Sequence, residues 1–383
     1  MNFALTAEQQ IIRNQVRNFA DKEIALVIAE FDKNKEFPKL LVKKGFDLGF
    51  AQIPWDEKYG GTNQGYLTYY YLLEELARVD CSYAFTFAAH CSLGTGFIYN
   101  GGTEAQKIKW IPALASGEFL GSFAFTESNS GSDVRGTQTS AVKIGNEWVL
   151  NGSKCFVSNA PQAGCIITTA VTDRDKGTDG FCSFIVPKET EGITISTPYE
   201  KLGLNSVDTC EIFFDNTRIS ENALIGGIPG KGYENLMMVL DDSRIALGAL
   251  GVGLSQGCLE SSLKYSEQRK QFGKTINSCQ TVAFKMADMY ARIEMARLLL
   301  SKAAWAKDNQ LPYSVYAAAG KLMSAILSVD AARDAVQIHG GYGCLKDYGI
   351  EKYYRDAKLL EICVGTNEVQ QLVLARLLGC PVR

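Results

Sequence analysis

The stretch "FAFTESNSGSDVRGTQT", residues 123–139, begins as a strand and then breaks up into serine, asparagine, glycine and aspartate. The chain before it reads as helices. After it, short β-branched and aromatic runs separated by turn residues predict strands. A strand end of this composition offers backbone N–H groups and hydroxyls that suit a polar ring edge or a phosphate. The stretch thus marks a change of fold class and a candidate ligand site, although alone it is also typical of a plain turn.

The spacing of apolar residues divides the chain into three regions, and this stretch lies at the boundary between the first two. We expect an α+β chain with an N-terminal α-helical domain (1–118), a middle β-sheet or barrel domain (119–228) and a C-terminal four-helix-bundle-like domain (229–383). The predicted helices are 6–32, 38–48, 65–79, 82–100, 104–116, 232–267, 278–308, 313–341 and 366–378, and the predicted strands are 119–127, 139–145, 147–160, 164–172, 181–187 and 209–220.

Composition excludes several classes of protein. The 383 residues carry a net charge of −3 and 21% charged side chains, so no basic nucleic-acid surface is expected. No run approaches 18 apolar residues, so we expect no membrane span. The N-terminus does not read as a signal peptide; instead, Thr6 and Gln9 predict a capping box. Eleven cysteines without metal-ligand spacing indicate reduced thiols, no metal and a cytoplasmic location.

Four further stretches carry residues that could bind a ligand. They are "NGSKCFVSNA" (151–160), "SEQRKQFGK" (266–274), "QIHGGYG" (337–343) and "VGTNE" (364–368). An aromatic beside a hydroxyl can pack on a planar cofactor, and a glycine cluster permits close backbone approach to a phosphate. Each also has an ordinary structural explanation, a core aromatic in a hairpin strand or a helix C-cap.

The order and spacing of these motifs, together with Thr126 to Asp133, closely resemble the acyl-CoA dehydrogenase flavoprotein family. The family's signatures are a T-E-P-x-A-G-S-D-like strand end, N-G-x-K-x-W/F-I-T/S, R-x-x-F-G, Q-I-x-G-G-x-G and a terminal E-G-T-x-E. Five ordered matches span 240 residues, and the resemblance covers essentially the whole chain.

The resemblance implies a homo-oligomer, usually a tetramer, in which each FAD is shared between subunits. It also implies an acyl thioester substrate and, as usual electron acceptor, an electron-transferring flavoprotein. Asp241 and Arg244, with Ser132 and Gly365, match positions that bind the thioester. The implied FAD-binding residues are Phe123, Phe125, Thr126, Gly131, Ser132, Phe156, Val157 and Ser158 around the flavin, Arg269, Phe272, Gly273, Gln280, Gln337, Gly340 and Gly341 on a neighbouring subunit's FAD, and Thr366, Asn367 and Glu368 from the chain's own subunit.

The family's catalytic base is missing from both places where relatives carry it. A glutamate normally removes the α-proton of the thioester, opposite the flavin. Val364 occupies the usual position, and Ser243, in "LDDSR" (240–244), occupies the alternative one. Asp242 is a substitute candidate, although one residue along a helix turns the side chain by about 100°. His90 and Glu361 are weaker candidates.

Three functions remain open at this point. The chain could oxidise or reduce an acyl-CoA with a relocated base. Alternatively, it could oxidise a hydroxyacyl or aminoacyl group on a carrier protein in natural-product biosynthesis, where a heteroatom proton leaves to water or Ser243. It could also be a non-catalytic FAD-binding scaffold, against which the nearly complete set of flavin contacts argues.

Overall fold

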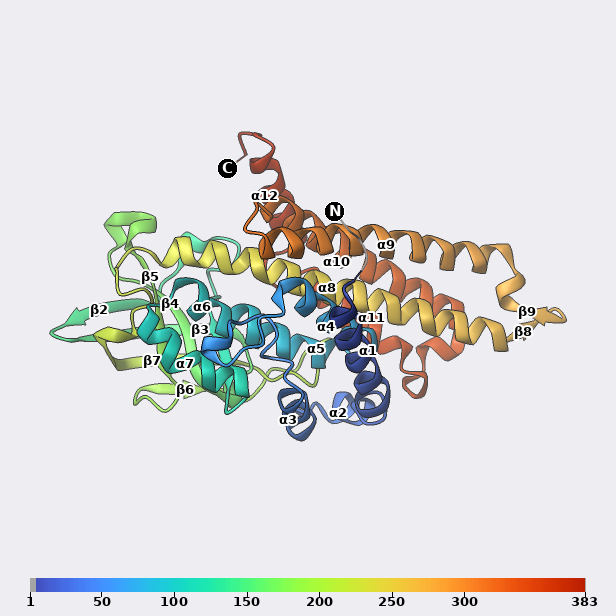
Figure 1. Ribbon diagram of the computed structural model, residues 1–383, viewed down its shortest axis with the longest axis horizontal. Coiled ribbons are helices and arrows are strands. Elements are labelled where there is room, and N and C mark those ends of the chain that lie inside the picture. The colour runs from blue at the N-terminus through green and yellow to red at the C-terminus, as the bar shows by residue number, and fades with distance from the viewer. Residues whose placement is uncertain (1–4, 383) are drawn as a thin grey trace.

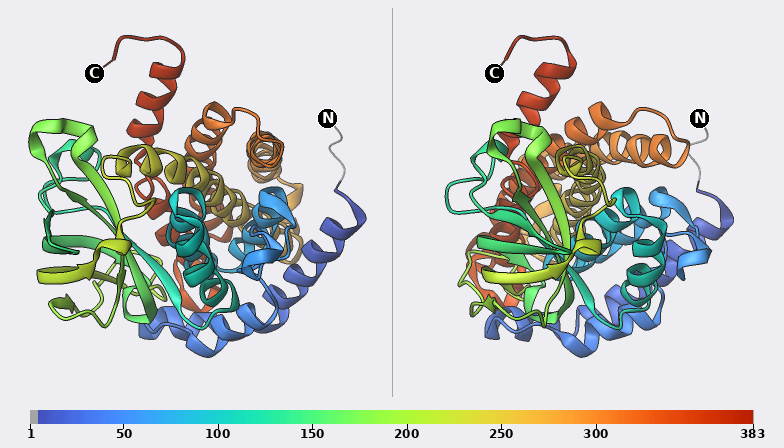
Figure 2. Two further views of the ribbon diagram at one scale, coloured as in Figure 1. Left: turned by 60° about the vertical axis from the view of Figure 1, so that its left-hand side comes forward. Right: turned by 90° about the vertical axis from the view of Figure 1, so that its left-hand side faces the viewer.

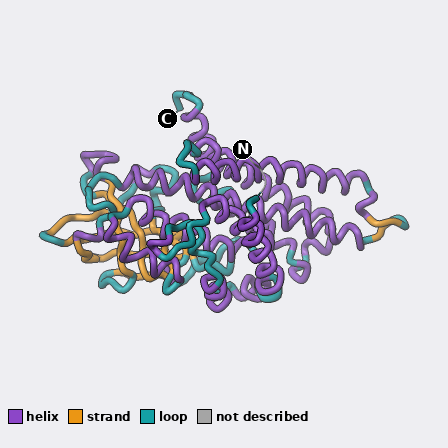
Figure 3. Tube along the Cα trace, viewed as in Figure 1, coloured by secondary structure: helices purple, strands orange, loops and turns teal. Residues whose placement is uncertain are grey.

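The computed structural model describes residues 5–382 and has the predicted α–β–α architecture (Figure 1). A mainly helical N-terminal part and a long C-terminal helical bundle flank one curled sheet, which occupies the opposite end of the molecule from the β8–β9 hairpin (Figures 1 and 3). The predicted fold class is therefore confirmed.

The N-terminal helices differ from the prediction in two places. They are α1 (Ala7–Phe19), α2 (Ile28–Asn34), α3 (Lys39–Asp47), α4 (Gly65–Val79), α5 (Cys81–Ala88), α6 (Gly96–Gly101) and α7 (Glu104–Ser116). The predicted helix 6–32 is interrupted by a π-helical turn at Ala20–Ile24, and the predicted helix 82–100 by another at Ala89–Thr95. The first interruption contains neither proline nor glycine, whereas the second contains Gly94 and is followed by Gly96, which the sequence analysis did not use as a sign of a break. The capping box of Thr6 and Gln9 is present.

Seven strands form one sheet in the order β1-β4-β2-β3-β7-β6, with β5 pairing to β4. β1, at one end of this order, pairs parallel with β4 and contacts the π-helical turn Ala89–Thr95, and the other long pairings are antiparallel. One face of the sheet buries an apolar cluster of its own around Trp148, Phe184 and Phe214. The strands are β1 (Leu120–Ala124), β2 (Ser140–Ile144), β3 (Glu147–Ser158), β4 (Ala163–Val171), β5 (Phe181–Pro187), β6 (Ile193–Ile195) and β7 (Thr209–Ser220).

The C-terminal bundle is built around α8 (Gly232–Gln268), which packs on α4 and α10 (Figure 2). Close approach requires glycine: a Cβ on Gly253 would lie 2.2 Å from the Glu74 carbonyl oxygen, and one on Gly251 would lie 2.8 Å from that of Ser324. The remaining elements are the hairpin β8 (Lys270–Gln271) and β9 (Lys274–Thr275), and the helices α9 (Gln280–Asp308), α10 (Ser314–His339), α11 (Ile350–Leu360) and α12 (Asn367–Leu377).

Helix α10 and the turn that follows it, residues 314–344, are long and apolar enough to span a membrane. They contain an 18-residue apolar window with a mean hydropathy of 1.2. However, 61% of that apolar window is buried among the described residues, because α8, α9, α11 and α12 all contact α10. Burial inside the bundle accounts for its apolar character.

Candidate active site

The flavin-side residues of the prediction come together where β1 and β3 end. Lys154 lies on β3 with its side chain fully buried, and its Nζ donates to Glu127 Oε1 (2.7 Å) and to the Phe125 carbonyl (3.1 Å). Glu127 in turn accepts from the backbone N–H groups of Gln138 and Thr139. Burial lowers the pKa of Lys154 to about 8, and Glu127 opposes that shift. The pair fixes both ends of the loop 127–139, a role that the sequence analysis did not assign to either residue.

The aromatic residues of this region are partly open to ligands. Phe156 has φ +57° and is 66% exposed, which leaves a large apolar ring uncovered at the end of β3. Phe123 stacks between Phe97 and Phe125. Val157 is different from what we expected of a cofactor contact, because its side chain is buried in the core of the sheet and only its backbone can face a ligand.

The second group of predicted cofactor residues lies at the far tip of the bundle. A cavity of about 590 Å³ contains Arg269, Gly340 and Gly341, together with Tyr265, His339 and Tyr342, which the sequence analysis did not identify. Nothing lies within 4 Å of a Cβ built on Gly273, Gly340 or Gly341, so the backbone there is open to close approach. The ring of Phe272, on the adjacent hairpin, is 96% exposed.

These two groups lie far apart on one chain. Arg244 lies in the first half of α8 and Arg269 directly after its C-terminus, so about 36 Å of straight helix separates them at 1.5 Å per residue. Figure 1 shows the sheet and the β8–β9 hairpin at opposite ends of the molecule. The two groups of predicted cofactor residues therefore lie at separate places on the chain.

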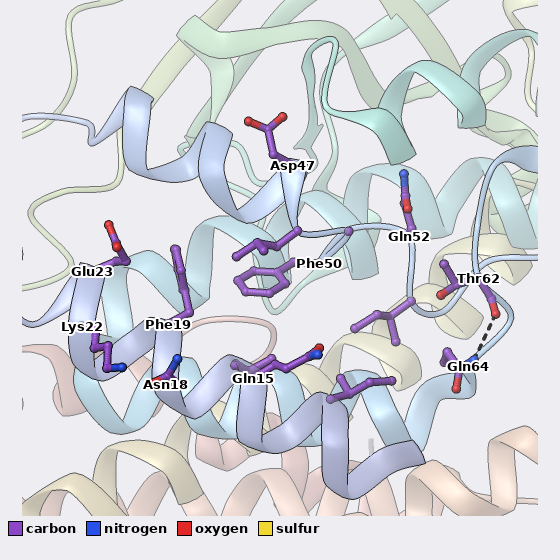
Figure 4. A pocket seen from close by; sticks show the side chains of 15 residues that line it. Gln15, Asn18, Phe19, Lys22, Glu23, Asp47, Phe50, Gln52, Thr62 and Gln64 are labelled. Atoms are coloured by element: carbon purple, nitrogen blue, oxygen red, sulfur yellow. Dashed lines mark hydrogen bonds between the residues drawn. The ribbon is translucent and has the colours of Figure 1, made fainter. Parts of the chain in front are cut away.

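A larger groove of about 710 Å³ contains none of the predicted site residues. It lies between α1 and the residues that follow α3, and Gln15, Phe19 and Phe50 are among its lining residues (Figure 4).

Val364 and Ser243 occupy the two positions at which relatives carry the catalytic base. Val364 lies in the turn between α11 and α12 at φ +54°, a conformation that a β-branched residue rarely adopts. Ser243 is fully buried on α8, and its Oγ donates to the Val239 carbonyl at 2.7 Å.

The substitute candidates are held by other groups. Asp242 is buried, and its carboxylate accepts from Asn100 (2.8 Å) and Tyr313 (2.7 Å) and pairs with Lys307 (2.7 Å). This arrangement does not favour Asp242 as a base. Glu361 pairs with Lys358 and accepts from Asn367 Nδ2.

His90 has both ring nitrogens engaged. Nδ1 accepts from the Gly121 N–H (2.9 Å), which leaves Nε2–H to donate to the Leu114 carbonyl (3.0 Å). Complete burial lowers the pKa of His90 to about 4. The residue therefore ties the π-helical turn to β1 and α7 as a neutral ring.

The thioester-side residues Asp241 and Arg244 are paired with each other, and Asp241 also accepts from Ser314 Oγ at 2.5 Å. Arg244 is buried and its Nε has no hydrogen-bond partner among the described residues, so donor capacity remains for a ligand.

Comparison with known proteins decides the family. The profiles of the acyl-CoA dehydrogenase N-terminal, middle and C-terminal domains match residues 6–118, 122–217 and 230–379. The chain belongs to the acyl-CoA dehydrogenase family. The probable acyl-CoA dehydrogenase YngJ of Bacillus subtilis is 45% identical over 98% of this chain and 99% of its own.

Two solved structures are similar to essentially the whole chain. Butyryl-CoA dehydrogenase from Megasphaera elsdenii has a TM-score of 0.97 and 37% identity, covering 99% of this chain and 100% of that one. The prolyl acyl carrier protein oxidase AnaB has a TM-score of 0.95 and 31% identity, covering 98% and 100%.

The chain is accordingly an FAD-dependent oxidoreductase that acts on an acyl thioester. Its residues fit the cofactor, because uncovered aromatic rings lie on the flavin side and open glycine backbone with an arginine lies at the tip. Bound FAD would supply the hydride acceptor. In the described part of the chain no cluster of ligating side chains could hold a metal, and all eleven cysteines are free.

Proposed function

We propose that this chain oxidises an acyl thioester without a carboxylate base at either family position, on a substrate whose proton leaves from a nitrogen or oxygen atom. The observation that carries this proposal is that Asp242, Glu361 and His90 are each bound by structural partners. A relocated base thus has no free candidate among the residues considered.

The redox step balances with FAD as the oxidant. An aminoacyl or hydroxyacyl group gives up a hydride from carbon, and the N–H or O–H proton leaves to water. The product carries a C=N or C=O bond. An O–H proton, or the N–H proton of an ammonium or iminium group, is more acidic than the α-proton of an ordinary acyl thioester, so the step does not require a carboxylate poised over carbon. Ser243 Oγ donates to Val239 and its lone pairs can accept a hydrogen bond, but the hydroxyl does not take up the departing proton.

The second candidate function is ordinary dehydrogenation of an acyl-CoA, or its reversal. The 45% identity to a probable acyl-CoA dehydrogenase favours it. The likeness to a carrier-protein oxidase favours the first candidate. For either reaction we propose an electron-transferring flavoprotein as acceptor, since it is the usual partner in the family.

Anaerobic mixing of the FAD-loaded protein with a panel of thioesters separates the two. The panel contains butyryl-CoA, isovaleryl-CoA, and prolyl and hydroxyacyl groups loaded on a carrier protein, with the unloaded carrier as control. We expect bleaching of FAD absorbance by a heteroatom-bearing thioester and little by butyryl-CoA. Bleaching by the free CoA esters alone would overturn the proposal in favour of the second candidate.

We also propose a shared cofactor site. The two halves of the site lie about 36 Å apart on one chain, which supports an oligomer in which each FAD contacts two chains.

A further inference from the structure

Helices α8 and α10 run side by side in the same direction. Asp241 on α8 accepts a hydrogen bond at 2.5 Å from the Oγ of Ser314, the first residue of α10. Further along both helices, a Cβ on Gly251 would lie 2.8 Å from the Ser324 carbonyl oxygen. Each helix advances by the same number of residues between these two contacts, so the two helices are parallel and close together throughout this stretch.

Two cationic side chains lie between these contacts. Arg244 on α8 is 6% exposed, and Lys321 on α10 is 1% exposed. Their positions relative to the two contacts place them about 6 Å apart along the helix axes, at 1.5 Å per residue. Burial lowers the pKa of Lys321 to about 8, and the Arg244 guanidinium adds to that shift, as expected for like charges close together. The interface between α8 and α10 thus contains two neighbouring buried cations.

The carboxylates of this region balance only one of the two charges. Asp241 pairs with Arg244. In the described structure Lys321 has no carboxylate within 4 Å, and its Nζ donates to the Gly365 carbonyl at 2.6 Å instead. The acids considered above as substitute bases are paired with other lysines. Two buried cations therefore share a single carboxylate.

The guanidinium of Arg244 has one edge without a partner. Its Nη1 donates to Asp241, whereas its Nε and Nη2 donate to no acceptor within residues 5–382. Nε is also buried, so solvent does not reach it. The N–H groups of Nε and Nη2 point the same way from the planar group, and this side-on pair matches the two oxygens of a carboxylate.

The turn that contains Val364 lies next to these cations, because the carbonyl that Lys321 contacts belongs to the following residue, Gly365. A glutamate at position 364, where relatives carry their base, would bring a second negative charge to this place. Val364 brings none, and its side chain packs against the apolar core. A buried charge without a counter-charge is costly, which points to a ligand that supplies one.

We propose that Arg244 and Lys321 form a carboxylate-binding site, and that the acyl group of the substrate carries a second carboxyl group besides its thioester. The side-on edge of Arg244 receives both oxygens of that carboxylate, and Lys321 balances its charge. This inference rests on the proposed function, because it takes an acyl thioester as the ligand. It narrows the substrate class to thioesters of hydroxy or amino dicarboxylic acids.

The first test measures binding to the FAD-loaded protein, read from the perturbation of the FAD spectrum. Butyryl-CoA and succinyl-CoA have acyl chains of equal length, but only succinyl-CoA ends in a carboxylate. The methyl ester of succinyl-CoA is the uncharged control, and malonyl-CoA and glutaryl-CoA move the carboxylate by one carbon in either direction. Free succinate is added as a competitor to distinguish a site for any anion from a site for the acyl group.

We expect at least one of the dicarboxylic acyl-CoA thioesters to bind about tenfold or more tightly than butyryl-CoA, as for a charge-assisted bidentate pair, and the methyl ester to lose this advantage. Equal affinity for butyryl-CoA and all three dicarboxylic thioesters would overturn the proposal. Binding of free succinate with no preference among the thioesters would identify a site for free anions and overturn it as well.

Two substitutions address the cations separately. Arg244→Lys keeps the charge but removes the planar fork, and Lys321→Met removes the second charge; each should reduce the preference for the dicarboxylic thioester about tenfold. Arg355→Lys is the matched control, since this arginine of α11 pairs with Asp32 and Glu351, and it should change the preference by less than about twofold. FAD content and thermal unfolding show which variants fold.

A substitution in the turn tests the same site without removing either cation. Val364→Glu supplies the second negative charge from the protein itself, so the preference for dicarboxylic thioesters should be lost. Val364→Gln has the same size without the charge and should retain the preference. An undiminished preference in Val364→Glu would contradict the proposal even if Arg244→Lys fails to fold.

The outcomes separate this inference from the proposed function. Bleaching of FAD by hydroxyacyl or aminoacyl thioesters, without any preference for a second carboxylate, would overturn the inference alone. A carboxylate preference in a protein whose FAD is bleached only by thioesters that lack a heteroatom would contradict the proposed function and leave the carboxylate site standing.

Discussion

At the scale of single residues, the side chains that could replace a missing base are distinguished by their hydrogen bonds. Asp242 is bound by three donors, and both nitrogens of His90 face fixed backbone groups. Val364 offers no proton acceptor and occupies a backbone conformation that costs a β-branched residue about 1–3 kcal/mol. The chain thus keeps a strained residue in the turn without gaining a base from it.

The structural role of His90 predicts a specific loss of stability in acid. The folded pKa of His90 is about 4, below the ordinary value of 6.5 that applies to the unfolded chain, so the unfolded state binds the proton first. Stability is then lost as pH falls from 6.5 towards 4, by up to about 1.4 kcal/mol per pH unit. Denaturant unfolding at pH 7.0, 5.5 and 4.5 should show a smaller acid loss in His90→Gln than in wild type. An identical loss in both proteins would mean that His90 is protonated in the folded state.

At the scale of elements, the spacing of apolar residues along the sequence predicted most helices and strands. The elements that it did not predict depend on contacts between residues far apart in the sequence. Strands β2, β3, β4, β5 and β7 follow alternating or β-branched runs bounded by turn residues, and were predicted within two residues of their observed ends. β6 has three residues and pairs with β7, too short for a pattern to identify. The π-helical turn at Ala89–Thr95 exists where Gly94 packs on Gly121, which no local pattern encodes.

The same limit applies to the site. The cofactor motifs were visible in the sequence because glycine, aromatic and hydroxyl residues cluster there. The pairing between motifs was not visible, since Glu127 and Lys154 belong to two different motifs and lie 27 positions apart.

Helix α11, which the sequence analysis did not predict, is fixed by a buried ion cluster. Lys352 Nζ lies 2.6 Å from Asp80 and 2.5 Å from Asp356, and Asp356 also accepts from the Leu204 N–H. Lys352→Met should lower the free energy of unfolding by about 3–5 kcal/mol, because two buried carboxylates lose their cation. Lys358→Met, on the same helix with a half-exposed pair, should change it by less than about 0.5 kcal/mol. Equal effects of the two substitutions in denaturant unfolding would contradict this account of α11.

At the scale of the whole molecule, the length of α8 separates the two groups of cofactor residues. Exposed apolar side chains on α9, among them Phe284, Met295 and Leu298, are consistent with a further covered surface in an oligomer. Under the proposal of a shared cofactor site, FAD retention would be a property of an assembly rather than of one chain.

Complementation between two defective chains tests this directly. Arg269→Ala removes the arginine of the tip cavity, and Phe156→Ala removes the exposed ring on the flavin side. Each variant alone should retain less FAD than wild type. Chains unfolded and refolded together should retain more FAD than either variant, because some sites then combine two unaltered halves. No recovery in mixed oligomers, verified by mass, would place each FAD within a single chain.

The central claim, that the position opposite the cofactor lacks its carboxylate, is tested most directly by the rate of anaerobic FAD reduction by butyryl-CoA in Val364→Glu, with Val364→Gln as the control of equal size. A positioned general base contributes about 10²–10⁴-fold. We predict that Val364→Glu reduces FAD at least about 100-fold faster than wild type and Val364→Gln, which should both remain slow. Wild type that already reduces FAD as fast as Val364→Glu would contradict the claim, because the unaltered chain would then possess a base of its own.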